Sequence, residues 1–228
     1  GLTDLQKAAF ARDGFVTVPG CFRAETMAAA LDACDRIFYG GQRFEAWRDA
    51  FDGSSGAVRD GFFDDGAAGR TQFPVGVDAL DRLIEDDAFL DAYADCLGTG
   101  AMHYCNAHLF VRSGPTDTRH APNPWEGFHF DHDTNCFLPP TGRVGIDDYV
   151  NCWVFLHDVG PDDAPMALIP GSHRQLADGL PGWIASGAFR PPTTFPDIRR
   201  VAEFAPAVSA TATAGTALFY SSWLVHAA

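Results

Sequence analysis

The amino-acid sequence changes character near residue 101. Before this point, apolar residues recur at helical spacing, whereas after it short apolar runs alternate with turns that are rich in proline and glycine. Short runs of this kind are typical of β-sandwiches and β-barrels. Because the helices come first and the strands follow, we expect a mainly β fold with helices bracing one outer face of the β core. The helical part covers about residues 1–98 and the β core about 101–228.

Local signals place the individual elements. A capping-box pattern at Thr3 starts a first helix that ends at Asp13-Gly14, and a strand follows at residues 15–18. Helical spacing predicts two more helices at 24–39 and 77–97, each followed by glycine. The predicted strands of the β core lie near 103–112, 127–132, 149–157, 166–169, 201–209 and 216–220. Residues 48–76, which are rich in Gly, Asp and Ser, are expected to form a long loop and are a candidate active-site cover.

Composition narrows the class of protein. The 228 residues suit one domain with a sizeable core. With Lys+Arg 16 against Asp+Glu 30, the net charge of −14 argues against nucleic-acid partners and anionic membrane surfaces. No membrane span or signal sequence is evident, so we expect a soluble, cytoplasmic protein. The six cysteines form no Cys-x-x-Cys pair, which indicates reduced core thiols rather than a structural zinc site.

One short pattern carries chemistry. His129 and Asp131 are two residues apart in a predicted strand, so their side chains project on the same face, and His226 lies far along the chain. Two histidines and one carboxylate on one triangular face are the ligand set of mononuclear non-haem Fe(II) oxygenases. The same residues could instead be a histidine and an aspartate that hydrogen-bond at the mouth of a sheet.

Four motifs, in order along the chain, resemble one family. The segment Met-Ala-Leu-Ile-Pro-Gly-Ser-His-Arg at 166–174 is similar to the "ViPGSHr" signature of the phytanoyl-CoA dioxygenase family, within the Fe(II)/2-oxoglutarate oxygenases. The opening at 5–19 resembles the N-terminus of that family, the His-x-Asp pair precedes the signature, and the segment 215–219 leads into His226. The resemblance implies a single oxygenase domain over 1–228, folded as a double-stranded β-helix, or cupin-like jelly-roll, with iron between its two sheets.

The resemblance also implies roles for particular residues. His129, Asp131 and His226 match the iron ligands of the family. His132, adjacent to Asp131, is the rival candidate ligand, but a neighbour one residue along a strand points to the opposite face. We expect it to contact a ligand residue or the substrate, or to be a simple surface histidine. We interpret His173, in the Pro-Gly-Ser-His turn, as structural.

The co-substrate site departs from the family pattern. Family members hold the distal carboxylate of 2-oxoglutarate with an arginine about ten residues beyond the second histidine, and this sequence stops at Ala228. We expect either truncation of the chain or a substitute residue, for which Arg112 at the end of a predicted strand is the best candidate. Asn151 and Trp153, on one face of another strand, are candidate contacts to co-substrate or substrate, and Trp153 is equally a candidate core aromatic.

The implied reaction is hydroxylation of an unactivated C–H bond of a small organic molecule. Fe(II), 2-oxoglutarate and O₂ are the expected cofactor and co-substrates, with succinate and CO₂ as products. Because Asp131 is present, we do not expect halogenation, for which relatives carry a small residue in its place. The alternatives are a non-catalytic jelly-roll that binds a metal or a partner, and a zinc hydrolase that uses the same ligands to activate water. Substrate identity, pathway and oligomeric state are left open.

Overall fold

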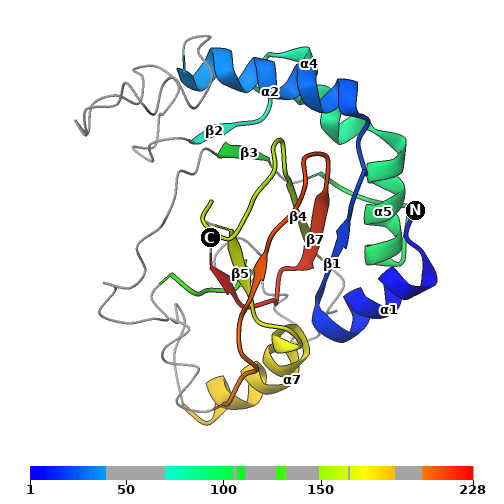
Figure 1. The fold of residues 1–228 in the computed structure, drawn as a ribbon. Helices are drawn as coiled ribbons and strands as arrows, with labels where there is room; N and C mark the ends of the chain where they lie inside the picture. The colour runs from blue at the N-terminus through cyan, green and yellow to red at the C-terminus, as the bar shows by residue number, and fades with distance from the viewer. Residues whose placement is uncertain are drawn as a thin grey trace, which may run out of the picture.

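The computed structural model describes residues 1–39, 70–104, 107–110, 127–131, 149–163, 165–187 and 202–227. Within these residues, antiparallel strands form the centre of the molecule and helices lie around them (Figure 1). The prediction of helices that brace a β core is therefore confirmed. The prediction of a mainly β chain is not, because helices occupy more of the described residues than strands do.

The strands form two three-stranded sheets and one two-stranded sheet among the described residues. The first sheet has the order β1-β7-β4 and the second has the order β6-β5-β8, both antiparallel. The third pairs β2 with β3. Their bounds are β1 Phe15–Val18, β2 Arg70–Gln72, β3 His108–Phe110, β4 Val150–Val154, β5 Met166–Leu168, β6 Val208–Ala210, β7 Ala217–Ser221 and β8 His226–Ala227.

The first two helices follow the sequence signals closely. In α1 (Asp4–Asp13), the Thr3 side chain accepts a hydrogen bond from the backbone N–H of Gln6, and the Gln6 side chain accepts one from the backbone N–H of Thr3. Gly14 ends this helix with φ 84°, a left-handed conformation that favours glycine. Helix α2 (Ala24–Tyr39) has the predicted bounds.

The third predicted helix, at 77–97, is wrong as a continuous element. The structure divides this segment into α4 (Asp78–Asp81), the 3₁₀ helix η1 (Arg82–Glu85) and α5 (Asp87–Leu97). The division occurs at Asp86, which is extended with ψ 125° and whose carboxylate accepts hydrogen bonds from the N–H groups of Ala88 and Phe89. An aspartate in this position caps a new helix, and the apolar periodicity on either side does not reveal the break.

A further helix follows the Pro-Gly-Ser-His segment. We expected only a turn there, but α7 (Ser172–Ala185) begins directly at Ser172. Strands β2 and β8 were also not predicted, whereas β1, β3, β4, β5, β6 and β7 lie within one residue of predicted ranges. Residues 48–69 of the predicted loop lie outside the described residues, and residues 70–72 form β2.

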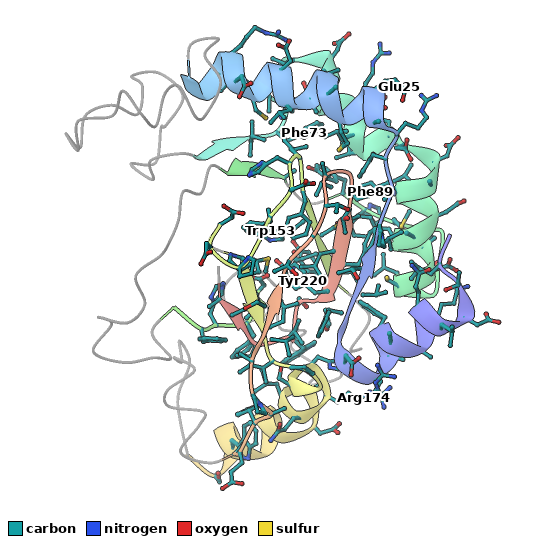
Figure 2. All side chains as sticks on the ribbon, viewed as in Figure 1. Glu25, Phe73, Phe89, Trp153, Arg174 and Tyr220 are labelled. Carbon is teal, nitrogen blue, oxygen red and sulfur yellow. The ribbon has the colours of Figure 1, made fainter. Side chains whose placement is uncertain are left out.

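The β1-β7-β4 sheet has a helix-covered face and an inner face. Phe219 of β7 faces α5, where its ring centroid lies 5.6 Å from that of Phe89 and 5.0 Å from that of Tyr93. Leu218 and Tyr220 alternate with it and belong to a separate buried cluster that includes Trp153. Figure 2 shows Tyr220 and Trp153 in the middle of the β core, with Phe89 beside α5. The inner face clusters with Met166, Leu168 and Ala210 of the second sheet, so it lies between the two sheets.

The described cysteines agree with the expectation of reduced thiols. Cys21, Cys34, Cys96 and Cys152 form no disulfide. Burial raises the pKa of Cys34 to about 12 and that of Cys21 to about 11, which disfavours the reactive thiolate.

Among the described helices, none combines the length and the apolar character that a membrane span needs.

The Pro-Gly-Ser-His segment is bonded to the chain just before β8. The buried Ser172 hydroxyl donates to the carbonyl of Ile169 at 2.8 Å and accepts from the backbone N–H of Val225 at 2.8 Å. The Ile169 N–H donates to the carbonyl of Val225 at 3.0 Å. These bonds hold the residue that precedes His226, and Leu168 of the same segment pairs with His226 across β5 and β8, so the signature segment supports a candidate metal ligand.

Replacement of Ser172 by alanine should lower the free energy of unfolding by about 1–3 kcal/mol, since the buried N–H of Val225 loses its acceptor. Chemical denaturation measures this change. Ser186→Ala is the matched control, because the Ser186 hydroxyl also donates to a carbonyl three residues earlier but is exposed. Its effect should stay within about 0.5 kcal/mol. Equal effects of the two substitutions would contradict the role of Ser172.

Candidate metal centre

Two histidines are paired directly across adjacent backbone segments. The N–H of His129 donates to the carbonyl of His226 at 2.8 Å, and the N–H of His226 donates to the carbonyl of His129 at 2.8 Å. Residues that exchange both bonds in an antiparallel pair carry their side chains on the same face. The two ring centroids accordingly lie 4.4 Å apart. The segment around His129 thus extends the second sheet beyond β8, and this pairing brings residues 97 positions apart in the sequence into one site.

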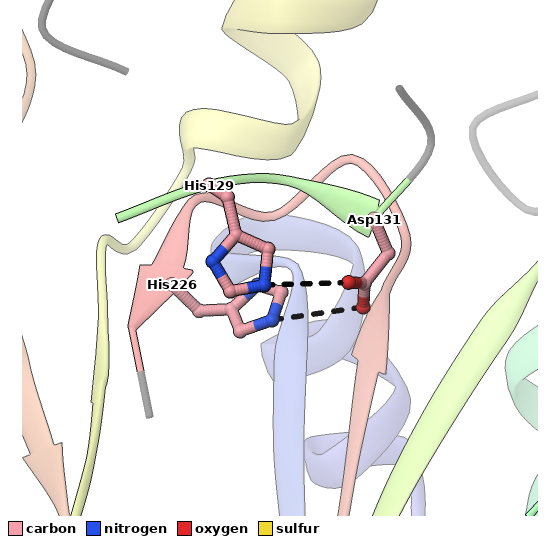
Figure 3. A group of neighbouring side chains, drawn as sticks. All are labelled: His129, Asp131 and His226. Atoms are coloured by element: carbon pink, nitrogen blue, oxygen red, sulfur yellow. Dashed lines mark ion pairs between the residues drawn. The ribbon is translucent and has the colours of Figure 1, made fainter. Parts of the chain in front are cut away.

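Asp131 completes a compact group of three side chains (Figure 3). Its Oδ1 lies 3.6 Å from Nε2 of His129, and its Oδ2 lies 3.6 Å from Nε2 of His226. One ligand atom from each residue lies within 4.8 Å of the others. In the described part of the chain, no other set of three or more His, Cys, Asp or Glu side chains converges in this way. The prediction that these three residues meet at one point agrees with the geometry.

The backbone fixes which nitrogen of each imidazole faces the centre. Nδ1 of His129 lies 2.8 Å from the carbonyl oxygen of Gly127, and Nδ1 of His226 lies 2.9 Å from that of Leu224. A carbonyl oxygen only accepts hydrogen bonds, so each Nδ1 carries a proton, and each Nε2 is the ring nitrogen that faces Asp131. Metal-binding histidines are oriented in the same way. This donor set of two imidazole nitrogens and one carboxylate fits an Fe(II) ion.

Burial and mutual interaction set the charges of the three groups. Burial by itself would raise the pKa of Asp131, but the hydrogen bond with His129 and the nearby histidine charges outweigh it and lower that pKa. Burial lowers the pKa of His226, which favours its neutral form. The hydrogen bond with Asp131 raises the pKa of His129. The ionised carboxylate and the neutral His226 are the protonation states that a metal ligand requires.

The inner face of the β1-β7-β4 sheet also reaches this group. Asn151 donates from Nδ2 to Oδ2 of Asp131 at 2.8 Å. Trp153 donates from Nε1 to the Tyr220 hydroxyl at 3.2 Å, and the Tyr220 ring centroid lies 4.9 Å from that of His226. Our expectation that Asn151 and Trp153 share one face agrees with these contacts, whereas their role towards a co-substrate stays a prediction.

Sequence reasoning missed Tyr220. The signal that could have found it is the two-residue alternation of β7, which places Leu218 and Tyr220 on the face opposite Phe219.

Arg112 and His132, the candidate anchor and the rival ligand, lie outside the described residues. His173 is not part of the centre, because its ring packs against Gly14 at the end of α1. Its interpretation as a structural residue agrees with this position.

Solved structures share the fold of the chain at low sequence identity. EctD from S. alaskensis, solved with 2-oxoglutarate and 5-hydroxyectoine, has a TM-score of 0.60 at 18% identity, covering 99% of this chain and 69% of EctD. SnoK, a non-haem α-ketoglutarate-dependent carbocyclase from nogalamycin biosynthesis, has a TM-score of 0.61 at 16% identity, covering 99% of this chain and 77% of SnoK. EvdMO1 has a TM-score of 0.57 at 18% identity, covering 97% of this chain but only 44% of EvdMO1.

Family membership comes from the sequence itself. No curated protein sequence matches the chain. The family model described as phytanoyl-CoA dioxygenase (PhyH), in contrast, matches residues 10–228, a range that contains His129, Asp131 and His226 together with the Pro-Gly-Ser-His segment. The match spans both sheets and the site between them, and we conclude that the chain belongs to the phytanoyl-CoA dioxygenase family.

Proposed function

We propose that the protein is an Fe(II)- and 2-oxoglutarate-dependent oxygenase that hydroxylates an unactivated C–H bond of a small organic molecule. The observation that carries this proposal is the convergence of His129, Asp131 and His226, with both Nδ1 atoms engaged by backbone carbonyls. Family membership and a shared fold with EctD, which has been solved with bound Fe, support it. We also infer that the two three-stranded sheets belong to a double-stranded β-helix within a single domain.

The chain would hold and orient the iron in a defined way. His129, Asp131 and His226 bind it through two Nε2 atoms and one carboxylate, and the carboxylate charge offsets part of the charge of the ion. Iron and 2-oxoglutarate together supply the activation of O₂ that oxidises a C–H bond. The His226 side chain is only 3% exposed, whereas that of His129 is 46% exposed. Co-substrate and substrate therefore approach from the side of His129.

The co-substrate anchor remains a separate proposal. An arginine binds a distal carboxylate through two parallel hydrogen bonds, and we retain Arg112 as the candidate for this contact. The reaction outcome is likewise a proposal, since SnoK is described as a carbocyclase. Retention of the carboxylate ligand Asp131 favours hydroxylation over halogenation. Mass analysis of products, with incorporation of one oxygen atom, distinguishes hydroxylation from ring closure.

Anaerobic titration of the apoprotein with Fe(II) and then with 2-oxoglutarate tests the co-substrate. We expect a visible metal-to-ligand charge-transfer band, because the keto acid chelates an iron that three protein ligands hold on one side. Zn(II) in place of Fe(II) is the control and should give no band. Tight Fe(II) binding without a band at millimolar 2-oxoglutarate would contradict the oxygenase and favour a metal-binding protein without catalysis.

A further inference from the structure

Two residues of the inner sheet face lie directly opposite each other beside the metal centre. In the register of β4 and β7, Asn151 pairs with Tyr220, and Trp153 pairs with Leu218. Directly opposed residues in an antiparallel pair place their side chains on the same face. Asn151 and Tyr220 thus share the face that looks towards Asp131 and His226. Trp153 is the diagonal neighbour of Tyr220 on that face.

The hydrogen bonds on this face have a fixed direction. An indole N–H can only donate, so Trp153 donates to the Tyr220 hydroxyl, which is 3.2 Å away. The single proton of that hydroxyl is then available for another acceptor, and the nearby Tyr220 helps to lower the pKa of the Asp131 carboxyl. Asn151 donates to Oδ2 of the same carboxylate at 2.8 Å. Asn151 thus reaches Asp131 from the inner face of the first sheet.

We propose that Asn151 is a positioning residue for the metal centre: its amide fixes the rotation of the Asp131 carboxylate, so that the carboxylate meets the metal together with His129 and His226. The proposal rests on the metal-binding role of these three residues. It gives Asn151 a task towards the protein itself, because its amide donates to the carboxylate. Tyr220 and Trp153 occupy the neighbouring positions on the same face, joined by their own hydrogen bond.

The cost of placing an amide here argues for a specific role. A polar group that is removed from water destabilises the fold unless it is hydrogen-bonded. Asn151 is half-buried in a strand whose neighbours Val150 and Cys152 pack in the apolar cluster under α5, and its amide meets this requirement through the bond to Asp131. Groups that hold a metal ligand in place typically change metal affinity by about 10- to 100-fold when they are removed.

Co(II) binding by the full chain tests this proposal without turnover. Asn151→Leu keeps the approximate size of the side chain and removes the donor, and it should weaken Co(II) affinity by about 10- to 100-fold in calorimetric titration. Asn151→Ala is the second variant, should the leucine perturb folding. Cys152→Ala is the matched control on the same strand, because Cys152 packs on the helix-covered face. It should lower the melting temperature and leave Co(II) affinity unchanged.

A double-mutant cycle separates positioning from a general structural effect. In an Asp131→Ala background, Asn151→Leu should cause no further loss of Co(II) affinity, because the carboxylate on which it acts is gone. Wild-type affinity in a folded Asn151→Leu protein, or an equal loss in both backgrounds, would overturn the positioning role. Wild-type Co(II) affinity in Asp131→Ala alone would instead overturn the metal centre, so the two failures are distinguishable.

Discussion

Asp131→Ala should abolish the Fe(II)-dependent formation of succinate from 2-oxoglutarate. The substitution removes the anionic member of the proposed ligand set and leaves only the two imidazoles. Loss of a group that only supports a ligand lowers metal affinity by about 10- to 100-fold, and loss of the carboxylate itself should lower Fe(II) affinity by more than this. Anaerobic Fe(II) titration and quantification of succinate under O₂ measure the two effects.

A second aspartate provides the control for Asp131→Ala. The Asp81 carboxylate also accepts two hydrogen bonds, from the N–H groups of Val75 and Gly76 at 2.8 Å each, but it lies in the helical part of the chain. Asp81→Ala should therefore lower stability while Fe(II) affinity stays at the wild-type value. Succinate formation at the wild-type rate by folded Asp131→Ala would mean that Asp131 is not a ligand.

Local sequence signals were sufficient for part of the fold and part of the site. The capping box at Thr3 and the glycine at 14 predicted α1 because helix ends are determined by residues a few positions apart. The pairing of His129 with Asp131 likewise follows from their spacing. His226 required the order of the motifs, since no local rule relates it to residues that lie far earlier in the chain.

The remaining features depend on contacts between distant segments. The bond from Asn151 to Asp131 exists because β4 meets β7 in one register and Asp131 lies over that face, neither of which is encoded near Asn151. From the sequence alone, Tyr220 is an ordinary strand residue, and only the register of β4 and β7 shows that it lies opposite Asn151. The break at Asp86 is local but competes with a continuous apolar period, so periodicity predicted one helix where the cap determines two.

Gly14→Ala should be strongly destabilising. Gly14 has φ +84°, which costs an L-residue about 1–2 kcal/mol. A Cβ at this position would also lie 2.5 Å from Nδ1 and 2.6 Å from Cγ of His173, whose ring is only 2% exposed and has little room to move. Overpacking of this kind costs about 1–3 kcal/mol more. We expect the free energy of unfolding, measured in urea, to fall by about 2–5 kcal/mol in total.

Gly98→Ala separates the two contributions. Gly98 ends α5 as Gly14 ends α1, with φ +68°, but no atom lies within 4 Å of a Cβ built there, so its substitution should cost only about 1–2 kcal/mol. His173→Ala should partly rescue Gly14→Ala, because removal of the ring makes room for the methyl group and renders the two effects non-additive. Additive effects in the double variant would show that the conformation of Gly14, rather than its contact with the signature histidine, accounts for the loss. The hydrogen bond from the Gly171 N–H to the Asp13 carbonyl, at 2.9 Å, already joins the Asp-Gly turn after α1 to the Pro-Gly-Ser-His segment. Rescue would show that these two segments are also coupled through the contact between Gly14 and His173.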